Sequence, residues 1–252
     1  MTRSIESFFA NRRRAKLIQK PLTDEQQSLL ADRVWAYTKL DHPQRTKFEN
    51  CVKVMFGERR WEGHRDFPVT DEMRLTIAGR ASLMLLGASN YYFQTVTTIL
   101  IYPRVIARSR DGHTTRTVGE AWPTGGILLC WPEIIADGIS NRGRNVVVHE
   151  FAHHLDGLDG EMGGSIPFPK RTDEARWHDV SHREYQRLVA AAERGEATLF
   201  DKYGSHNLAE FFAVASECFF EQPVEMKRIH EELYDLLRVF YQLDPTVWQQ
   251  NA

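Results

Sequence analysis

Residues 146–156 read VVVHEFAHHLD, and this stretch decides what fold and chemistry the chain can have. Its apolar spacing predicts a helix that begins at Asn145 and ends near Gly157. His149 and His153 are four residues apart, so on a helix they project from one face, about one turn apart. Two imidazoles at this separation can bind one Zn²⁺ at about 2.0–2.1 Å each.

Glu150 follows the first histidine and would lie beside the metal without binding it. From there its carboxylate can take a proton from a water molecule that zinc activates, and pass it to the leaving amine. A five-residue match is weak on its own. The predicted helix and the apolar run at residues 146–148, which would bury the helix start, favour a zinc peptidase over a helix with two incidental histidines.

A catalytic zinc needs a third protein ligand and an open position for water. Asp159 lies six residues after His153, as in metzincin-type sites, but that arrangement needs glycine at position 156, which is aspartate here. The other candidates are Glu210 and Glu217, which share a face of an apolar predicted helix over residues 207–221. Buried carboxylates need partners, and either a metal or two arginines would serve. The residues alone leave the choice between the two glutamates open.

The rest of the chain predicts an α+β fold, mostly helical, with a small mixed sheet just before the motif helix. Further helices are expected over residues 22–40, 46–56, 70–86, 181–194 and 223–243. Strands are expected over residues 95–102 and 126–131, and a surface loop over residues 156–173. We expect an N-terminal helical region, residues 1–80, packed on a zincin-like catalytic core, residues 81–252.

Composition narrows the class of protein. The 252 residues carry a net charge of −2, which gives no reason to expect nucleic-acid binding. The basic run at residues 12–14 is typical of a solvated helix face. Cys51, Cys130 and Cys218 form no CxxC pair, which indicates free thiols in a reducing compartment. Residues 82–106 are too often interrupted for a membrane span, so we expect a cytoplasmic protein.

The motif does not stand alone, because several other segments match the same known family. HEFAHHLD at residues 149–156, Tyr203-Gly204 and AEFFAVASE at residues 209–217 resemble the Mlc titration factor A family of bacterial zinc peptidases. ILIYP at residues 99–103 and GEAW at residues 119–122 are also similar to it, so the resemblance covers the chain from about residue 45 onward. It implies a gluzincin-like fold related to the catalytic core of anthrax lethal factor.

The resemblance implies roles for individual residues. His149, His153 and Glu210 would bind zinc, and Glu150 would be the general base. Tyr203 precedes Glu210 by seven residues, as the transition-state tyrosine does in lethal-factor-like sites. Its hydroxyl could donate to the developing oxyanion, whereas the alternative is a tyrosine that only packs at a helix entry.

Three further expectations follow from the resemblance. Glu217 would accept a hydrogen bond from the Nδ1 of a zinc-binding histidine. His154 replaces the lysine or glutamine expected there, which indicates a position that faces solvent. The strand at residues 126–131 is either an edge strand that pairs with an extended substrate, or a central strand.

Two functions are compatible with these residues. The first is hydrolysis of peptide substrates with zinc as cofactor, and the expected type is an aminopeptidase. The second, implied by the resemblance, is a regulatory protein that binds the glucose-regulon repressor Mlc and sequesters it from DNA, with zinc in a structural or vestigial site. Direct contact with nucleic acid or membrane is expected in neither case.

Overall fold

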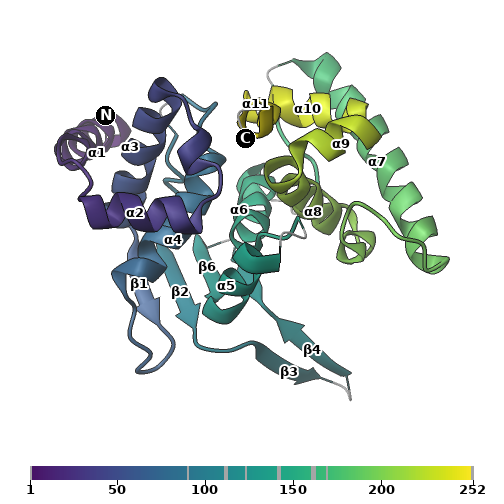
Figure 1. The fold of residues 1–252 in the computed structure, drawn as a ribbon, viewed down its shortest axis with the longest axis horizontal. Helices are drawn as coiled ribbons and strands as arrows, with labels where there is room; N and C mark the ends of the chain where they lie inside the picture. The colour runs from purple at the N-terminus through teal and green to yellow at the C-terminus, as the bar shows by residue number, and fades with distance from the viewer. Residues whose placement is uncertain are drawn as a thin grey trace.

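A four-stranded sheet, a two-stranded ribbon and eleven α-helices make up the part of the chain that this computed structural model describes (Figure 1). That part is residues 2–89, 91–110, 113–122, 124–140, 143–159, 163–168 and 170–250. The helices are α1 (Thr2–Gln19), α2 (Asp24–Arg33), α3 (His42–Glu58), α4 (Asp71–Leu83), α5 (Trp131–Ser140), α6 (Val146–Asp156), α7 (Arg171–Glu193), α8 (Leu208–Glu221), α9 (Pro223–Ile229), α10 (Glu231–Tyr241) and α11 (Thr246–Gln250). The strands are β1 (Arg60–Gly63), β2 (Thr98–Tyr102), β3 (Ile106–Arg110), β4 (His113–Thr117), β5 (Gly119–Ala121) and β6 (Gly126–Cys130). The predicted α+β class, with a small mixed sheet and a large helical part, is confirmed.

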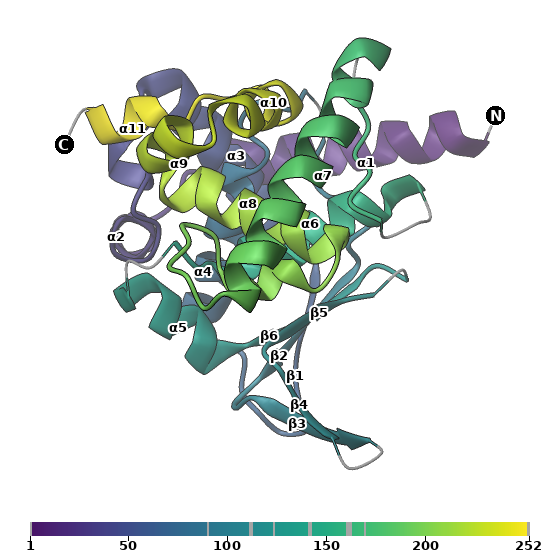
Figure 2. The ribbon, with the colours of Figure 1, turned by 90° about the vertical axis from the view of Figure 1, so that its right-hand side faces the viewer.

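The order of strands in the larger sheet is β1-β2-β6-β5, and it decides which strand borders the site. β1, β2 and β6 are parallel, whereas β5 runs antiparallel to β6. All five residues of β6 are buried, as expected of a strand covered on both faces. The possibility that residues 126–131 form the edge strand is therefore wrong, because the short strand β5 covers that edge. β3 and β4 form a separate ribbon that projects from the molecule (Figure 2).

Side-chain caps fix where the helices begin. Thr23 accepts from the backbone N–H of Gln26, and the Gln26 side chain accepts from Thr23, so the predicted capping box is present. The side chains of Asn145 and Asn207 cap α6 and α8 by accepting from the backbone N–H groups of Val148 and Glu210. These two caps set the start of both helices that carry the candidate ligands.

The structure corrects several predicted boundaries. α7 begins at Arg171, not at residue 181, because Trp177 and Val180 extend its buried stripe toward the N-terminus and shorten the predicted loop. Residues 223–243 form two helices that break at His230, whose φ of −127° and ψ of 52° are not helical. α3 begins at His42, four residues before the predicted start. The helix predicted over residues 22–40 ends at Arg33, and α5, α11 and the strands β1, β3, β4 and β5 were not predicted.

One hydrophobic core runs through the described chain, from Leu22 in the N-terminal helices to Trp248 in α11. The division into residues 1–80 and 81–252 stays a prediction. The three cysteines are buried thiols, as expected. No helix among the described residues is long and apolar enough to span a membrane.

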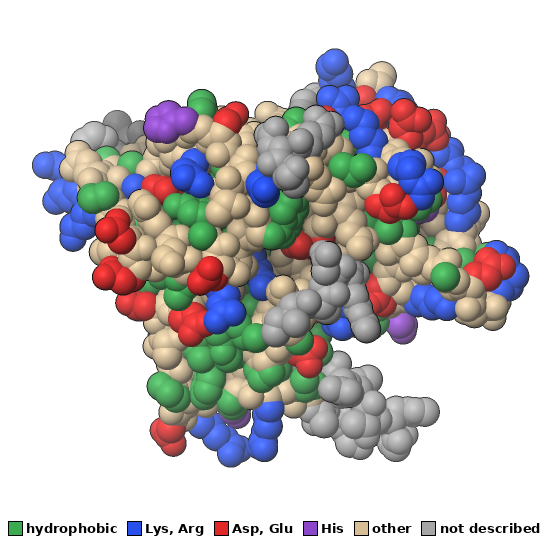
Figure 3. All heavy atoms as spheres, in the orientation of Figure 1, with side chains coloured by type: hydrophobic (Ala, Val, Ile, Leu, Met, Phe, Trp, Pro, Cys, Tyr) green, Lys and Arg blue, Asp and Glu red, His purple; other side chains and the backbone are tan. Residues whose placement is uncertain are grey.

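The basic segment near the N-terminus is partly neutralised by the fold. Arg13 and Arg14 on α1 both form ion pairs with Glu58 on α3, at 3.0 Å. Acidic and basic side chains are interspersed over the face drawn in Figure 3. The expected solvated helix face therefore has a second role, because it holds α1 against α3.

Candidate metal centre

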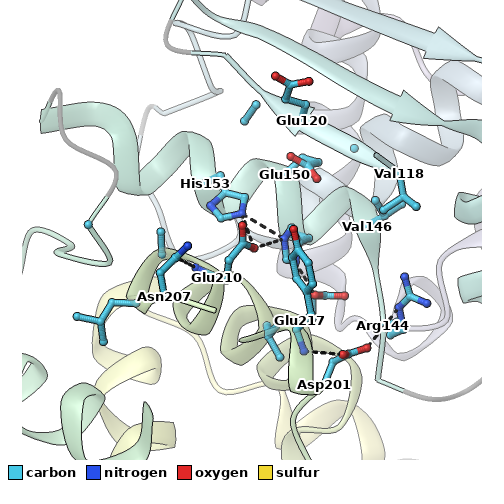
Figure 4. Close-up of a pocket in the computed structure, with 18 residues that line it drawn as sticks. Val118, Glu120, Arg144, Val146, Glu150, His153, Asp201, Asn207, Glu210 and Glu217 are labelled. Atoms are coloured by element: carbon cyan, nitrogen blue, oxygen red, sulfur yellow. Dashed lines mark hydrogen bonds and ion pairs between the residues drawn. The ribbon is translucent and has the colours of Figure 1, made fainter. Parts of the chain in front are cut away.

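Two helices that contact each other, α6 and α8, bring together residues some sixty positions apart in the sequence. The Asn207 cap accepts from the backbone N–H of Glu210 at 2.9 Å, which places that glutamate in the first turn of α8. Its carboxylate points toward His153 on α6 (Figure 4). The site thus lies between the start of one helix and the middle of the other.

Three ligand atoms converge at this point. The Nε2 atoms of His149 and His153 are 3.1 Å apart, and Oε2 of Glu210 lies 3.0 Å from the first and 3.1 Å from the second. Two atoms that bind one zinc ion tetrahedrally, at about 2.0–2.1 Å each, lie about 3.3 Å from each other. Two imidazoles and one carboxylate are also a donor set that zinc peptidases use. The residues therefore fit a zinc ion, and they form a group able to hold a metal among the described residues.

The charges of the metal-free site are coupled. Although burial opposes protonation of the His149 ring, hydrogen bonds to Glu210 and Glu217 raise the pKa of His149 well above its usual range. Burial would raise the pKa of Glu210, but its bonds to the two histidines prevail and lower that pKa to about 2. A metal ion would have to displace a proton from His149 in order to bind.

A further carboxylate, that of Glu217, orients the His149 ring through the nitrogen that faces away from Glu210. Glu217 accepts from Nδ1 of His149 at 2.7 Å through one oxygen, and from the backbone N–H of Asn145 at 2.5 Å through the other. The Asn145 amide donates to Glu221 at 2.6 Å. This leaves Nε2 of His149 directed at the metal position and ties the start of α6 to the far end of α8.

Glu150 is buried beside the ligands, with 4% of its surface exposed. Burial raises the pKa of Glu150 to about 7, and the neighbouring histidines oppose this increase. The edge strand lies directly against the carboxylate, because a Cβ built on Gly119 would come within 2.3 Å of Oε1 of Glu150. Only glycine lets β5 approach so closely, and nothing in the sequence alone indicated this contact.

The metal position opens into a cavity of about 880 Å³. Tyr203 lines it from the 3₁₀ turn Lys202–Ser205, with its ring 6.0 Å from that of His149. Burial, together with the charges of Glu210 and Glu150, raises the pKa of Tyr203, so its hydroxyl stays protonated. Arg144 also lines the cavity, 3.8 Å from Asp201 (Figure 4).

The structure separates the competing candidates for third ligand. Glu210 faces both histidines, whereas Glu217 contacts only the far nitrogen of His149. Asp159 ends the turn Gly157–Asp159, and its side chain lies outside the described residues. The expectation that His154 faces solvent is wrong, because α6 turns it inward, where it is 8% exposed and its Nε2 lies 2.8 Å from Thr95 Oγ1.

Comparison with known proteins finds relatives over most of the chain. The sequence pattern of the family described as glucose-regulated metallo-peptidase M90 matches residues 8–242. An uncharacterized protein of Synechocystis sp. is 37% identical over 246 residues, covering 93% of this chain and 90% of that protein. Mlc titration factor A of Pectobacterium atrosepticum is 31% identical over 227 residues, covering 84% and 85%. Mlc titration factor A of Yersinia pestis is 27% identical over 221 residues, covering 82% and 80%.

Proposed function

Because the chain belongs to the family of glucose-regulated metallo-peptidases M90, we propose that it is a zinc-dependent peptidase, with His149, His153 and Glu210 as the zinc ligands. The observation that carries the proposal is the convergence of three ligand atoms, 3.0–3.1 Å apart, beside the buried carboxylate of Glu150. Zinc in this position supplies Lewis acidity, which polarises a carbonyl and lowers the pKa of water to about 7.

The side chains around the metal position have distinct roles in this proposal. Glu150 is the general base, which takes the proton of the attacking water and delivers it to the leaving amine. The protonated hydroxyl of Tyr203 donates to the oxyanion that develops on the scissile carbonyl. Glu217 keeps the Nδ1 proton of His149 in place, so that the lone pair of Nε2 faces the metal.

The substrate lies along β5 in this proposal. β5 pairs with β6 at the end of the described sheet, and residues 118–121 line the catalytic cavity. An extended peptide can therefore add to the sheet beside Glu150, which is a common mode of peptide recognition. We assign the activity to short peptides and aminoacyl amides, as for an aminopeptidase. The cytoplasmic location expected from the sequence stays a prediction.

Replacement of the general base tests the proposal directly. Glu150→Gln should lower kcat by at least about 100-fold, because the amide cannot accept the proton. Zinc content should stay at one equivalent, because the side chain is not a ligand. The measurement is hydrolysis of a panel of aminoacyl p-nitroanilides and a peptide library, with zinc determined by mass spectrometry. Unchanged turnover, or loss of zinc in this variant, would refute the assigned role.

A second candidate function is binding to a transcriptional repressor. It is favoured by the name of two relatives, Mlc titration factor A. A regulator can retain a metal site, so binding to Mlc and hydrolysis are compatible. Pull-down of purified Mlc by the wild type and by Glu150→Gln separates them, because a binding protein should capture the repressor equally well in both forms.

A further inference from the structure

Two histidines outside the metal centre lie together on the outer face of α7. His178 and His182 are one helical turn apart, with their ring centroids separated by 4.2 Å and their planes at 35°. The rings of His149 and His153 in the metal centre have centroids 4.8 Å apart. The second pair therefore has the spacing at which two imidazoles on one helix can share a metal ion.

The ring of His182 is already oriented by a hydrogen bond. Nδ1 of His182 lies 2.9 Å from the carbonyl oxygen of His178, and because a carbonyl only accepts, Nδ1 carries the proton. Nε2 of the neutral ring then has a free lone pair. Nδ1 of His178 lies 3.6 Å from a carboxylate oxygen of Asp179, which is too far for a hydrogen bond that would fix its tautomer. An acceptor behind Nδ1 is what orients metal-binding histidines, as Glu217 does for His149.

The surroundings leave room for an ion and further ligands. The side chain of His178 is 71% exposed, so an ion can reach it from solvent. Both histidines line a cavity of about 370 Å³ together with Glu174, which lies one turn earlier on α7 and can add an oxygen ligand. Gly163 and Leu208 border both this cavity and the catalytic one, so the pair lies close to the rim of the catalytic cavity.

We propose that His178 and His182 form a second metal site, separate from the candidate catalytic centre, for a divalent ion that prefers imidazole, such as Zn²⁺, Ni²⁺ or Cu²⁺. Water, and Glu174 after rotation of its side chain, complete the coordination. The site is weaker than the first, because it has two fixed protein ligands and lies open to solvent, whereas the centre between α6 and α8 has three.

Zinc itself is the probe for this site. The full chain is first loaded with one equivalent of zinc, and further zinc is then titrated while binding is followed by calorimetry and equilibrium dialysis. The wild type should bind a second equivalent. In His178→Gln/His182→Gln that second step should weaken by at least about 10-fold, the size of loss seen when metal-site contacts are removed. Each single variant should lose nearly as much, because both rings are needed for chelation.

Controls distinguish this site from adventitious binding. His42→Gln removes an exposed histidine from α3 and should leave both binding steps unchanged. The first equivalent and the far-UV circular dichroism of the double variant should match those of the wild type, because the exchanged side chains lie on the outer face of α7. Two results would overturn the proposal: a wild type that binds only one equivalent, or a second equivalent that binds the double variant with unchanged affinity.

Discussion

Gly119→Ala is the substitution for which the structure makes the sharpest prediction. The new Cβ would lie 2.3 Å from Oε1 of Glu150 and 2.6 Å from its Cδ and Cγ, whereas ordinary contact begins at 3.4 Å. Either the carboxylate or β5 must therefore move by about 1 Å. Glu150 lines the catalytic cavity, so its carboxylate is the part that yields, and the proposed general base is displaced from the position it needs. A misplacement of about 1 Å can cost about 100-fold in rate, or about 2.7 kcal/mol of transition-state stabilisation.

The assay is steady-state hydrolysis of an aminoacyl p-nitroanilide, with zinc content measured in parallel. Gly163→Ala is the matched control, because Gly163 also lines the catalytic cavity but a Cβ there meets no atom within 4 Å. We expect kcat to fall in Gly119→Ala and to stay unchanged in the control, with one equivalent of zinc in both. A rise in KM alone would mean that the strand moved and the base did not. Wild-type kcat in Gly119→Ala would refute the reasoning.

Three further predictions concern the residues around the metal position. Glu210→Ala should weaken zinc binding more than Glu217→Ala does. Glu217→Ala removes only a contact that orients His149, so zinc affinity should fall by about 10- to 100-fold. Competition with a fluorescent chelator gives both affinities, and the reverse order would mean that Glu217 is the ligand. Tyr203→Phe should lower kcat by about 100-fold with little change in KM, because the hydroxyl contributes only in the transition state; equal kcat in stopped-flow assays would assign the ring to packing alone. Zinc binding at pH 7 should release about one proton, because hydrogen bonds to Glu210 and Glu217 keep His149 protonated in the metal-free protein. Affinity should therefore fall as pH falls below the pKa of His149, and calorimetry in two buffers of different ionisation enthalpy counts the proton; no buffer dependence would contradict the assigned protonation.

The sequence predicted those helices that have a capping residue and an apolar stripe. The α6 stretch has an asparagine cap, an apolar stripe and a terminating glycine, and it is helical as predicted. α8 is a second example, since Asn207 caps it and its apolar residues are buried. By contrast, α5 lies directly after the buried strand β6, and its apolar residues read as a continuation of that strand. The three-residue strand β5 is too short for any periodicity, and it exists only because β6 offers it a partner.

For the candidate site, the sequence by itself determined the two histidines and the glutamate between them, because a four-residue spacing on one helix is local geometry. It could not decide between Glu210 and Glu217, since both lie on the same face of α8 and only the packing of α8 against α6 decides which carboxylate faces Nε2 and which faces Nδ1. The approach of Gly119 to Glu150 likewise depends on the position of an edge strand that the linear order does not reveal. Spacing along one helix is a short-range property, whereas the candidate third ligand and the walls of the cavity come from contacts between segments that only the tertiary structure brings together.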